Sequence, residues 1–115
     1  MKEASVADDL ARMKCRPCEG GVPPLSAHQA NAMLAQLKGW AIDNGRLVKL
    51  YPFINYYQTT AFVNALAWIS HREDHHPDLA VGYNRCRVEY WTHAADGLTE
   101  NDFICAAKCD ALFEL

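Results

Sequence analysis

Hydrophobic side chains recur along this chain with two periods, one typical of helices and one typical of strands. The helical period fits residues 26–39, residues 56–72 and the stretch that follows Thr99. A period of two fits residues 40–53 and 79–93, and it indicates a hairpin in each stretch. Helices and hairpins therefore alternate, which predicts an α+β fold with helices on one face of an antiparallel sheet.

Each predicted helix starts at a residue whose side chain can cap the first turn. A second polar side chain three residues later can bond back to the capping residue, as in a capping box. The pairs are Ser26 with Gln29, Asn55 with Gln58, and Thr99 with Asp102. Gly39 is placed to end the first helix, and Pro77 prevents the second helix from continuing past it.

The turns of the two hairpins have their own signals. Asn44-Gly45 favours the positive backbone angles of a tight two-residue turn. Pro52 predicts that the strand after this turn ends there or runs along an edge. In the second hairpin we expect the turn at Asn84-Arg85. Its strands are predicted from two alternating sets, which are Leu79, Val81 and Tyr83 before the turn and Cys86, Val88, Tyr90 and Thr92 after it.

Composition and charge are those of one globular domain. The chain has 115 residues, of which 50% are hydrophobic and 22% are charged. A Gly/Pro-rich stretch at 19–24 predicts a boundary between an N-terminal arm, residues 1–20, and a folded domain, residues 21–115. The formal net charge of -3 argues against nucleic acid or an anionic membrane as the main partner, because both require a basic face.

The sequence predicts neither a membrane span nor an export signal, and its cysteine count fits a protein that stays in the cytoplasm. No apolar run approaches the roughly 20 residues of a membrane span, and the first residues lack the apolar core of a signal peptide. An odd count of five cysteines fits free thiols in a reducing cytoplasm. Cys15 and Cys18 have metal or redox spacing, but no second pair lies nearby, so we interpret them as thiols of the arm.

The stretch "HREDHHPD", residues 71–78, holds three of the five histidines, and His93 follows at the end of a predicted strand. One interpretation is a solvated helix terminus, where protonated histidines suit the negative end of the helix dipole. Another is a metal site, because His71 and His75 have the i, i+4 spacing of zinc-binding helices. Metal is the weakest interpretation, because Arg72 replaces the glutamate of that motif and the rings of adjacent histidines diverge.

The third interpretation is general acid–base catalysis. Imidazole titrates near neutral pH and can give or take a proton without a cofactor. Two or three imidazoles around one pocket can hold complementary protonation states, as a dehydration requires. Aromatic side chains could wall a site for a flat ring, although in a hairpin they more often belong to a core; the candidates are Trp68, Tyr83, Tyr90 and Trp91.

Several motifs in fixed order resemble the signature of the pterin-4a-carbinolamine dehydratases. They are "DHHPD" at 74–78, "YN" at 83–84, "TH" at 92–93 and "GLTENDF" at 97–103, while "CEGGVPPL" at 18–25 and the hairpin at Trp40 resemble the bacterial members. The resemblance covers most of the chain from about Cys15. It implies a four-stranded antiparallel sheet with three helices, assembled as a homodimer or homotetramer. It also implies dehydration of a 4a-hydroxytetrahydropterin, formed by aromatic amino-acid hydroxylases, to the quinonoid dihydropterin.

The resemblance further implies which residues act, with no metal or organic cofactor. The catalytic residues it implies are His75, His76, His93 and Asp102. The substrate-binding residues it implies are Asp74, His75, His76, Pro77, Trp91, Thr92, His93 and Ala94. We expect His75 and His93 to form the acid–base pair, His76 to orient the hydroxyl group, and Asp102 to hold an imidazole or the helix start.

Two positions depart from the family pattern. His71 stands where the family often has glutamate, and Asp96 replaces the first glycine of the Gly-Gly pair before Leu98 and Thr99. Neither departure removes a catalytic group, but His71 could shift the charge state of the histidine pair.

Other functions remain open from the sequence. Ile104, Ala107 and Ala111 form one apolar stripe of the last helix, and a second stripe lies beside it, formed by Cys105, Cys109 and Leu112. We interpret the second stripe as a homo-oligomer interface; a protein-binding module similar to a transcriptional coactivator is the alternative. A pterin-related role in molybdopterin metabolism is a further alternative, and a functional link to a phenylalanine hydroxylase is expected.

Overall fold

A computed structural model describes residues 6–17 and 22–115, so Cys18 lies outside the described residues. Four strands form one antiparallel sheet in the order β1-β2-β4-β3. The strands are β1 (Ala41–Asp43), β2 (Arg46–Pro52), β3 (Asp78–Val81) and β4 (Arg85–Tyr90). The helices are α1 (Val6–Arg12), α2 (Ala27–Leu34), α3 (Tyr56–Glu73) and α4 (Glu100–Phe113), with a short 3-10 helix η1 (His93–Ala95).

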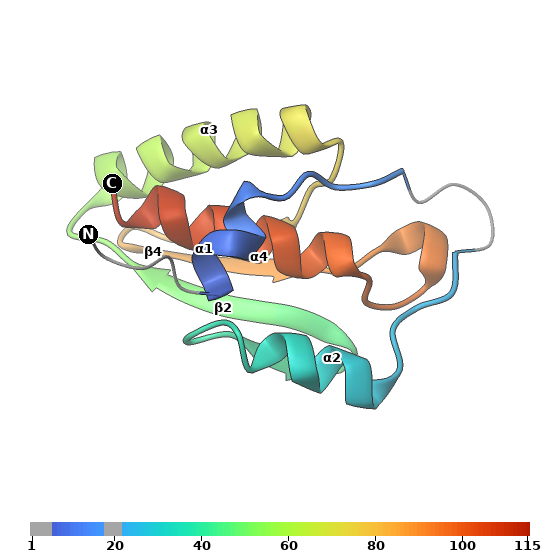
Figure 1. Cartoon of the computed structure of the whole chain (residues 1–115). Coiled ribbons are helices and arrows are strands. Elements are labelled where there is room, and N and C mark those ends of the chain that lie inside the picture. The colour runs from blue at the N-terminus through green and yellow to red at the C-terminus, as the bar shows by residue number, and fades with distance from the viewer. Residues whose placement is uncertain (1–5, 18–21) are drawn as a thin grey trace.

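The helices gather on one face of the sheet, as the sequence predicts. In Figure 1, α4 crosses the sheet between α3 and α2, and α1 lies against the outer side of α4. The predicted α+β fold is confirmed, and α1 is a fourth helix beyond the three expected. No helix in the part of the chain that the structure describes is long and apolar enough to cross a membrane.

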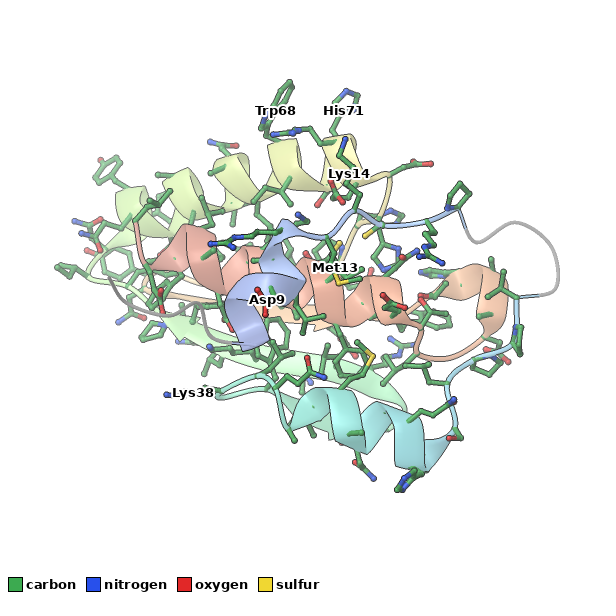
Figure 2. The ribbon with its side chains drawn as sticks, viewed as in Figure 1. Asp9, Met13, Lys14, Lys38, Trp68 and His71 are labelled. Carbon is green, nitrogen blue, oxygen red and sulfur yellow. The ribbon has the colours of Figure 1, made fainter. Side chains whose placement is uncertain are left out.

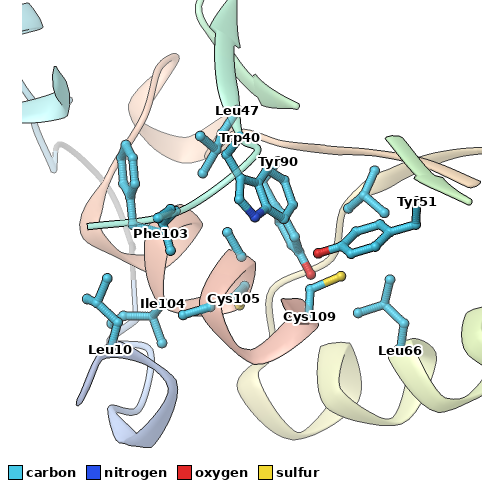
Figure 3. Packing of buried hydrophobic residues seen from close by; sticks show 14 of the residues in the cluster. Leu10, Trp40, Leu47, Tyr51, Leu66, Tyr90, Phe103, Ile104, Cys105 and Cys109 are labelled. Carbon is cyan, nitrogen blue, oxygen red and sulfur yellow. The ribbon is translucent and has the colours of Figure 1, made fainter. Parts of the chain in front are cut away.

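The core lies between the two central strands and α4. Inward-facing residues of β2 pair with those of β4, so that Leu47 lies opposite Tyr90 and Tyr51 lies opposite Cys86. All four are fully buried. Figure 3 shows the side chains of α4 entering this cluster from the other side. Because α4 is covered by the sheet, by α3 and by α1, its two ends are held in place relative to every other layer.

The second apolar stripe of the last helix is therefore not a surface. Cys105 and Cys109 have no exposed area, and Leu112 is half-buried. The interpretation of this stripe as an oligomer interface is wrong, because the chain's own sheet and N-terminal residues cover it. Part of the cover is α1, whose Leu10 belongs to the core although it lies in the predicted arm.

The first hairpin follows the prediction, whereas the second differs in its turn. Asn44 and Gly45 have φ values of 52° and 76°, and β2 ends at Pro52 without being an edge strand. The second turn spans residues 82–84 instead of Asn84-Arg85, because the N–H of Gly82 donates to the carbonyl of Arg85 over 2.8 Å.

The first predicted helix is shorter than expected. Its capping box at Ser26 is present, but α2 ends at Leu34 rather than near Gly39. The N–H of Leu37 donates to the carbonyl of Leu34, a tighter i to i-3 bond that interrupts the α-helical pattern. Gly39 has φ +79° and lies at the end of this turn.

Candidate active site

The end of α3 determines where His75 lies. Asp74 adopts the left-handed conformation with φ 50°, which aspartate tolerates better than most residues. The N–H of Asp74 donates to the carbonyl of His71, and the N–H of His75 donates to that of Ser70. These two bonds form a Schellman motif. The helix therefore ends before His75, and His71 and His75 do not share a helical face.

A short closed loop positions His93. The N–H and carbonyl of Thr92 both bond to Gly97, which closes the loop that contains η1. Asp96 has φ 50°, a conformation that glycine adopts freely, so the departure from Gly-Gly keeps the backbone shape. At Gly97 a Cβ atom would lie 2.8 Å from Cβ of Pro24, so close approach requires glycine there.

Asp102 joins these two elements. Its carboxylate is fully buried, and its Oδ2 accepts bonds from the N–H of Thr99 over 2.9 Å and from the hydroxyl of Thr92 over 2.8 Å. Its Oδ1 lies 2.6 Å from Nε2 of His75. The same carboxylate is the capping-box acid of α4. One side chain therefore caps the helix, secures the start of the η1 loop and binds an imidazole.

The imidazole of His75 is held on its face as well as on its edge. Its ring stacks on Tyr90 at 5.9 Å between centroids with an interplanar angle of 7°. Tyr90 is fully buried, and burial raises the pKa of its hydroxyl well above the ordinary value. The side chain of His75 is 11% exposed. His75 is thus fixed in orientation while keeping an edge at the surface of the pocket.

His76 and His93 are exposed and lie closer to solvent. Their ring centroids are 6.1 Å apart. The ring of His93 also lies 3.9 Å from the ring of Trp91, and the guanidinium of Arg46 covers Trp91 at 4.5 Å. The strand end and the helix end therefore present their imidazoles to one another.

These side chains surround one pocket of about 430 Å³. Seven of the eight expected substrate-binding residues line it, which are Asp74, His75, His76, Trp91, Thr92, His93 and Ala94. Pro77 is the exception and lines a separate hollow under α3 with Leu66 and Leu79. His71 is not among the lining residues; it projects from α3 beside Trp68, as Figure 2 shows.

Six further residues line the pocket and were not expected from the sequence. They are Cys15, Arg16, Pro17, Arg72, Glu73 and Asn101. Arg72, Glu73 and Asn101 lie next to predicted site residues in the sequence, so their adjacency to the histidine motif or to Asp102 could have indicated that they line the pocket. The first three come from the arm, and no local pattern relates them to the site.

A larger hollow of about 680 Å³ lies near the start of α3, around Phe53, Phe62 and Phe113. Among the described residues, its lining contains no acidic, basic or imidazole side chain, so it lacks groups for proton transfer. No group of three or more His, Cys, Asp or Glu side chains that could hold a metal ion occurs within residues 6–17 and 22–115.

Three imidazoles line one open pocket, and a buried carboxylate binds one of them. These features define the class of protein: a small α+β protein with a histidine-lined pocket. A family model described as Pterin 4 alpha carbinolamine dehydratase matches residues 23–112. The chain belongs to this family and is an enzyme of the hydro-lyase class. The resemblance seen in the sequence is confirmed.

Relatives are similar over nearly the whole chain. A protein of Nitrosospira multiformis, whose name assigns it to pterin-4-alpha-carbinolamine dehydratase, is 61% identical over 108 residues, with 94% of this chain and 96% of the relative covered. One of Nitrosomonas eutropha with the same name is 64% identical over 105 residues, covering 90% and 93%. One of Legionella pneumophila strain Corby is 50% identical over 110 residues, covering 93% and 97%.

Solved structures share the fold. A crystal structure described as a transcriptional coactivator/pterin dehydratase from Brucella melitensis has a TM-score of 0.75 and 28% identity, covering 77% of this chain and 97% of that chain. A pterin dehydratase-like protein described as a RuBisCO assembly factor in the alpha-carboxysome has a TM-score of 0.53 and 31% identity, covering 64% and 84%.

Proposed function

We propose that this protein dehydrates a 4a-hydroxytetrahydropterin to the quinonoid dihydropterin by histidine acid–base catalysis. The observation that carries the proposal is the 2.6 Å contact between His75 and the buried Asp102, at the edge of a pocket that His76 and His93 also line. The reaction removes a proton from N5 of the pterin, expels the hydroxyl of C4a as water and forms the C4a–N5 double bond. It therefore requires one proton acceptor and one proton donor.

His75 is the better proton acceptor. A carboxylate can only accept hydrogen bonds, so the contact with Asp102 assigns the ring hydrogen of His75 to Nε2. Nδ1 of the neutral ring then carries a lone pair, which can take the proton from N5. The negative charge of Asp102 stabilises the imidazolium that results, as in other acid–base sites that pair histidine with aspartate.

His93 is then the proton donor to the departing hydroxyl. It is exposed and comes from the strand end, whereas His75 comes from the helix end, so the two can address different atoms of one bound ring. His76, at 6.1 Å from His93, orients the hydroxyl group. Each positioned imidazole contributes typically 10²–10⁴-fold to such a reaction. Protonated His93 and neutral His75 would regenerate by proton exchange with water.

The pterin substrate lies, in this proposal, among the seven expected binding residues that line the pocket, with Trp91 providing an aromatic face. The residues given a catalytic role in this proposal all lie in the predicted domain, residues 21–115. We also propose a cytoplasmic homodimer or homotetramer that acts on the product of a phenylalanine hydroxylase. Exposed apolar side chains on the edge strand β3, Leu79 and Val81, support assembly with a second copy.

A coactivator-like role has less support. The second stripe of α4, which would have offered a protein-binding surface, is buried within the chain. No observation favours a role in molybdopterin metabolism.

The test is a coupled assay with a pterin-dependent phenylalanine hydroxylase, in which absorbance follows the 4a-hydroxy intermediate. The protein is expected to shorten the lifetime of that intermediate in proportion to its concentration. A lifetime that does not change at any protein concentration would overturn the proposal.

A further inference from the structure

Residues Cys15–Pro17 form one wall of the imidazole pocket, called here the N-terminal wall. They follow α1 and line the same hollow as His75, His76 and His93. The family model begins at residue 23, so this wall lies outside the segment by which the family is recognised. It is a part of the site that the family match does not define.

Asn101 attaches the wall to the start of α4. Its side-chain Oδ1 accepts a bond from the N–H of Arg16 over 3.0 Å, and its Nδ2 donates to the carbonyl of Arg16 over 2.6 Å. One buried amide side chain thus satisfies both backbone groups of a single residue, much as a neighbouring strand would. The attachment acts on the backbone and so does not depend on the side chain of Arg16.

Glu73 attaches the same wall to the end of α3. Its Oε1 accepts a bond from the N–H of Cys15 over 2.9 Å. The thiol of Cys15 also lies 3.4 Å from that of Cys105 on α4. The wall is therefore held from two sides, by residues directly beside the elements that present His75 and Asp102.

We propose that the N-terminal wall is part of the pterin-binding surface and that Asn101 and Glu73 are positioning residues that hold it there. The inference rests on the function proposed above. A wall that closes one side of the pocket adds contact area to a flat bicyclic ring and excludes water, and the proposed mechanism assigns none of its groups a proton transfer. Its loss should weaken binding and raise KM, while kcat changes little, because the imidazoles stay in place.

The experiment compares Glu73→Ala with Glu73→Gln and also tests Asn101→Ala. The control is Asn64→Ala, because Asn64 is an exposed amide on α3 that does not line the pocket. Calorimetry measures Kd for 7,8-dihydrobiopterin, and the coupled assay gives KM and kcat. Loss of one such hydrogen bond corresponds to about a fivefold change in an equilibrium constant. Kd and KM should therefore rise about fivefold in Glu73→Ala and more in Asn101→Ala.

The glutamine variant separates position from charge. Its side-chain oxygen can still accept from the N–H of Cys15, so wild-type Kd is expected in Glu73→Gln. If the glutamine and alanine variants lose binding equally, or if Kd stays at the wild-type value in Glu73→Ala and Asn101→Ala, the inference is overturned. Should Asn101→Ala fail to fold, the two Glu73 variants decide alone. A wild-type protein that neither binds dihydrobiopterin nor shortens the intermediate's lifetime contradicts the proposed function itself.

Discussion

Nε2 of His75 lies 2.6 Å from Oδ1 of Asp102, a carboxylate with no exposed surface. The carboxylate accepts from three donors on three parts of the chain, so it cannot be changed without affecting both the histidine and the helix start. Asp102→Asn preserves its shape but places an amide NH₂ toward at least one donor. If the NH₂ faces His75, the ring must carry its hydrogen on Nδ1, and the lone pair that accepts the proton of N5 is lost.

We therefore expect Asp102→Asn to lower kcat by about 10²-fold or more. It should also lower the free energy of unfolding by about 1–3 kcal/mol, because a buried donor loses its acceptor. Steady-state kinetics and urea unfolding measure the two effects, and ¹⁵N NMR of the ring reports the tautomer. Wild-type kcat with the hydrogen still on Nε2 would show that the carboxylate has no role in the reaction.

His75→Ala and His93→Ala should each lower kcat strongly, by about 10²–10⁴-fold. His93 is exposed, so its removal should leave the fold unchanged. Because the two imidazoles act in one proton-transfer step, the double variant should lose less than the product of the single losses. Kd for dihydrobiopterin should change far less than kcat in each variant. Near-wild-type turnover in His93→Ala would contradict the assigned roles.

The sequence predicts the part of the site that depends on local signals. Thr99 and Asp102 read as a capping box, and they form one. The contact between Asp102 and His75 could not be predicted from the sequence, because it depends on how α4 and α3 pack against each other. The attachment of Arg16 to Asn101 is likewise a tertiary contact across 85 positions of sequence.

Apolar patterns do not show what will cover them. Apolar alternation identified both strands of the second hairpin, but it carries no information on strand order, and Leu79 and Val81 on the edge strand β3 remain partly exposed. An apolar stripe on a helix indicates that something covers it. It does not identify the cover, and for Cys105 and Cys109 the cover is the same chain.

His71→Ala should have little effect. The side chain is exposed on α3, its ring contacts Trp68 at 5.7 Å between centroids, and it does not line the pocket. The free energy of unfolding should change by no more than about 0.5 kcal/mol, and kcat should remain near the wild-type value. The measurement is kcat of His71→Ala beside kcat of His76→Ala, a variant that removes an imidazole lining the pocket. A large loss of turnover in His71→Ala would place this histidine in the reaction after all.

The buried thiol of Cys109 should make the protein sensitive to alkali. Burial raises its pKa from 9.0 to about 12, against a smaller lowering by the hydrogen bond with Tyr51. Burial also raises the pKa of Tyr51 and of Tyr90 above their ordinary values. A raised pKa in the folded state means that the folded chain holds the proton of this thiol more tightly than the unfolded chain does, so the protonated thiol stabilises the fold. Its contribution is complete below pH 9 and is lost as the pH rises from 9 toward 12.

The free energy of unfolding should accordingly be level from pH 7 to about 8.5 and then fall. At pH 10.5 the loss from Cys109 alone is about 2 kcal/mol, with the tyrosines adding to it. Urea unfolding at several pH values in the presence of a reductant measures this dependence. Cys109→Ala should start from a lower stability, because it leaves a small cavity, yet show a shallower alkaline slope. Equal slopes in the two proteins would mean that this thiol is not the group responsible.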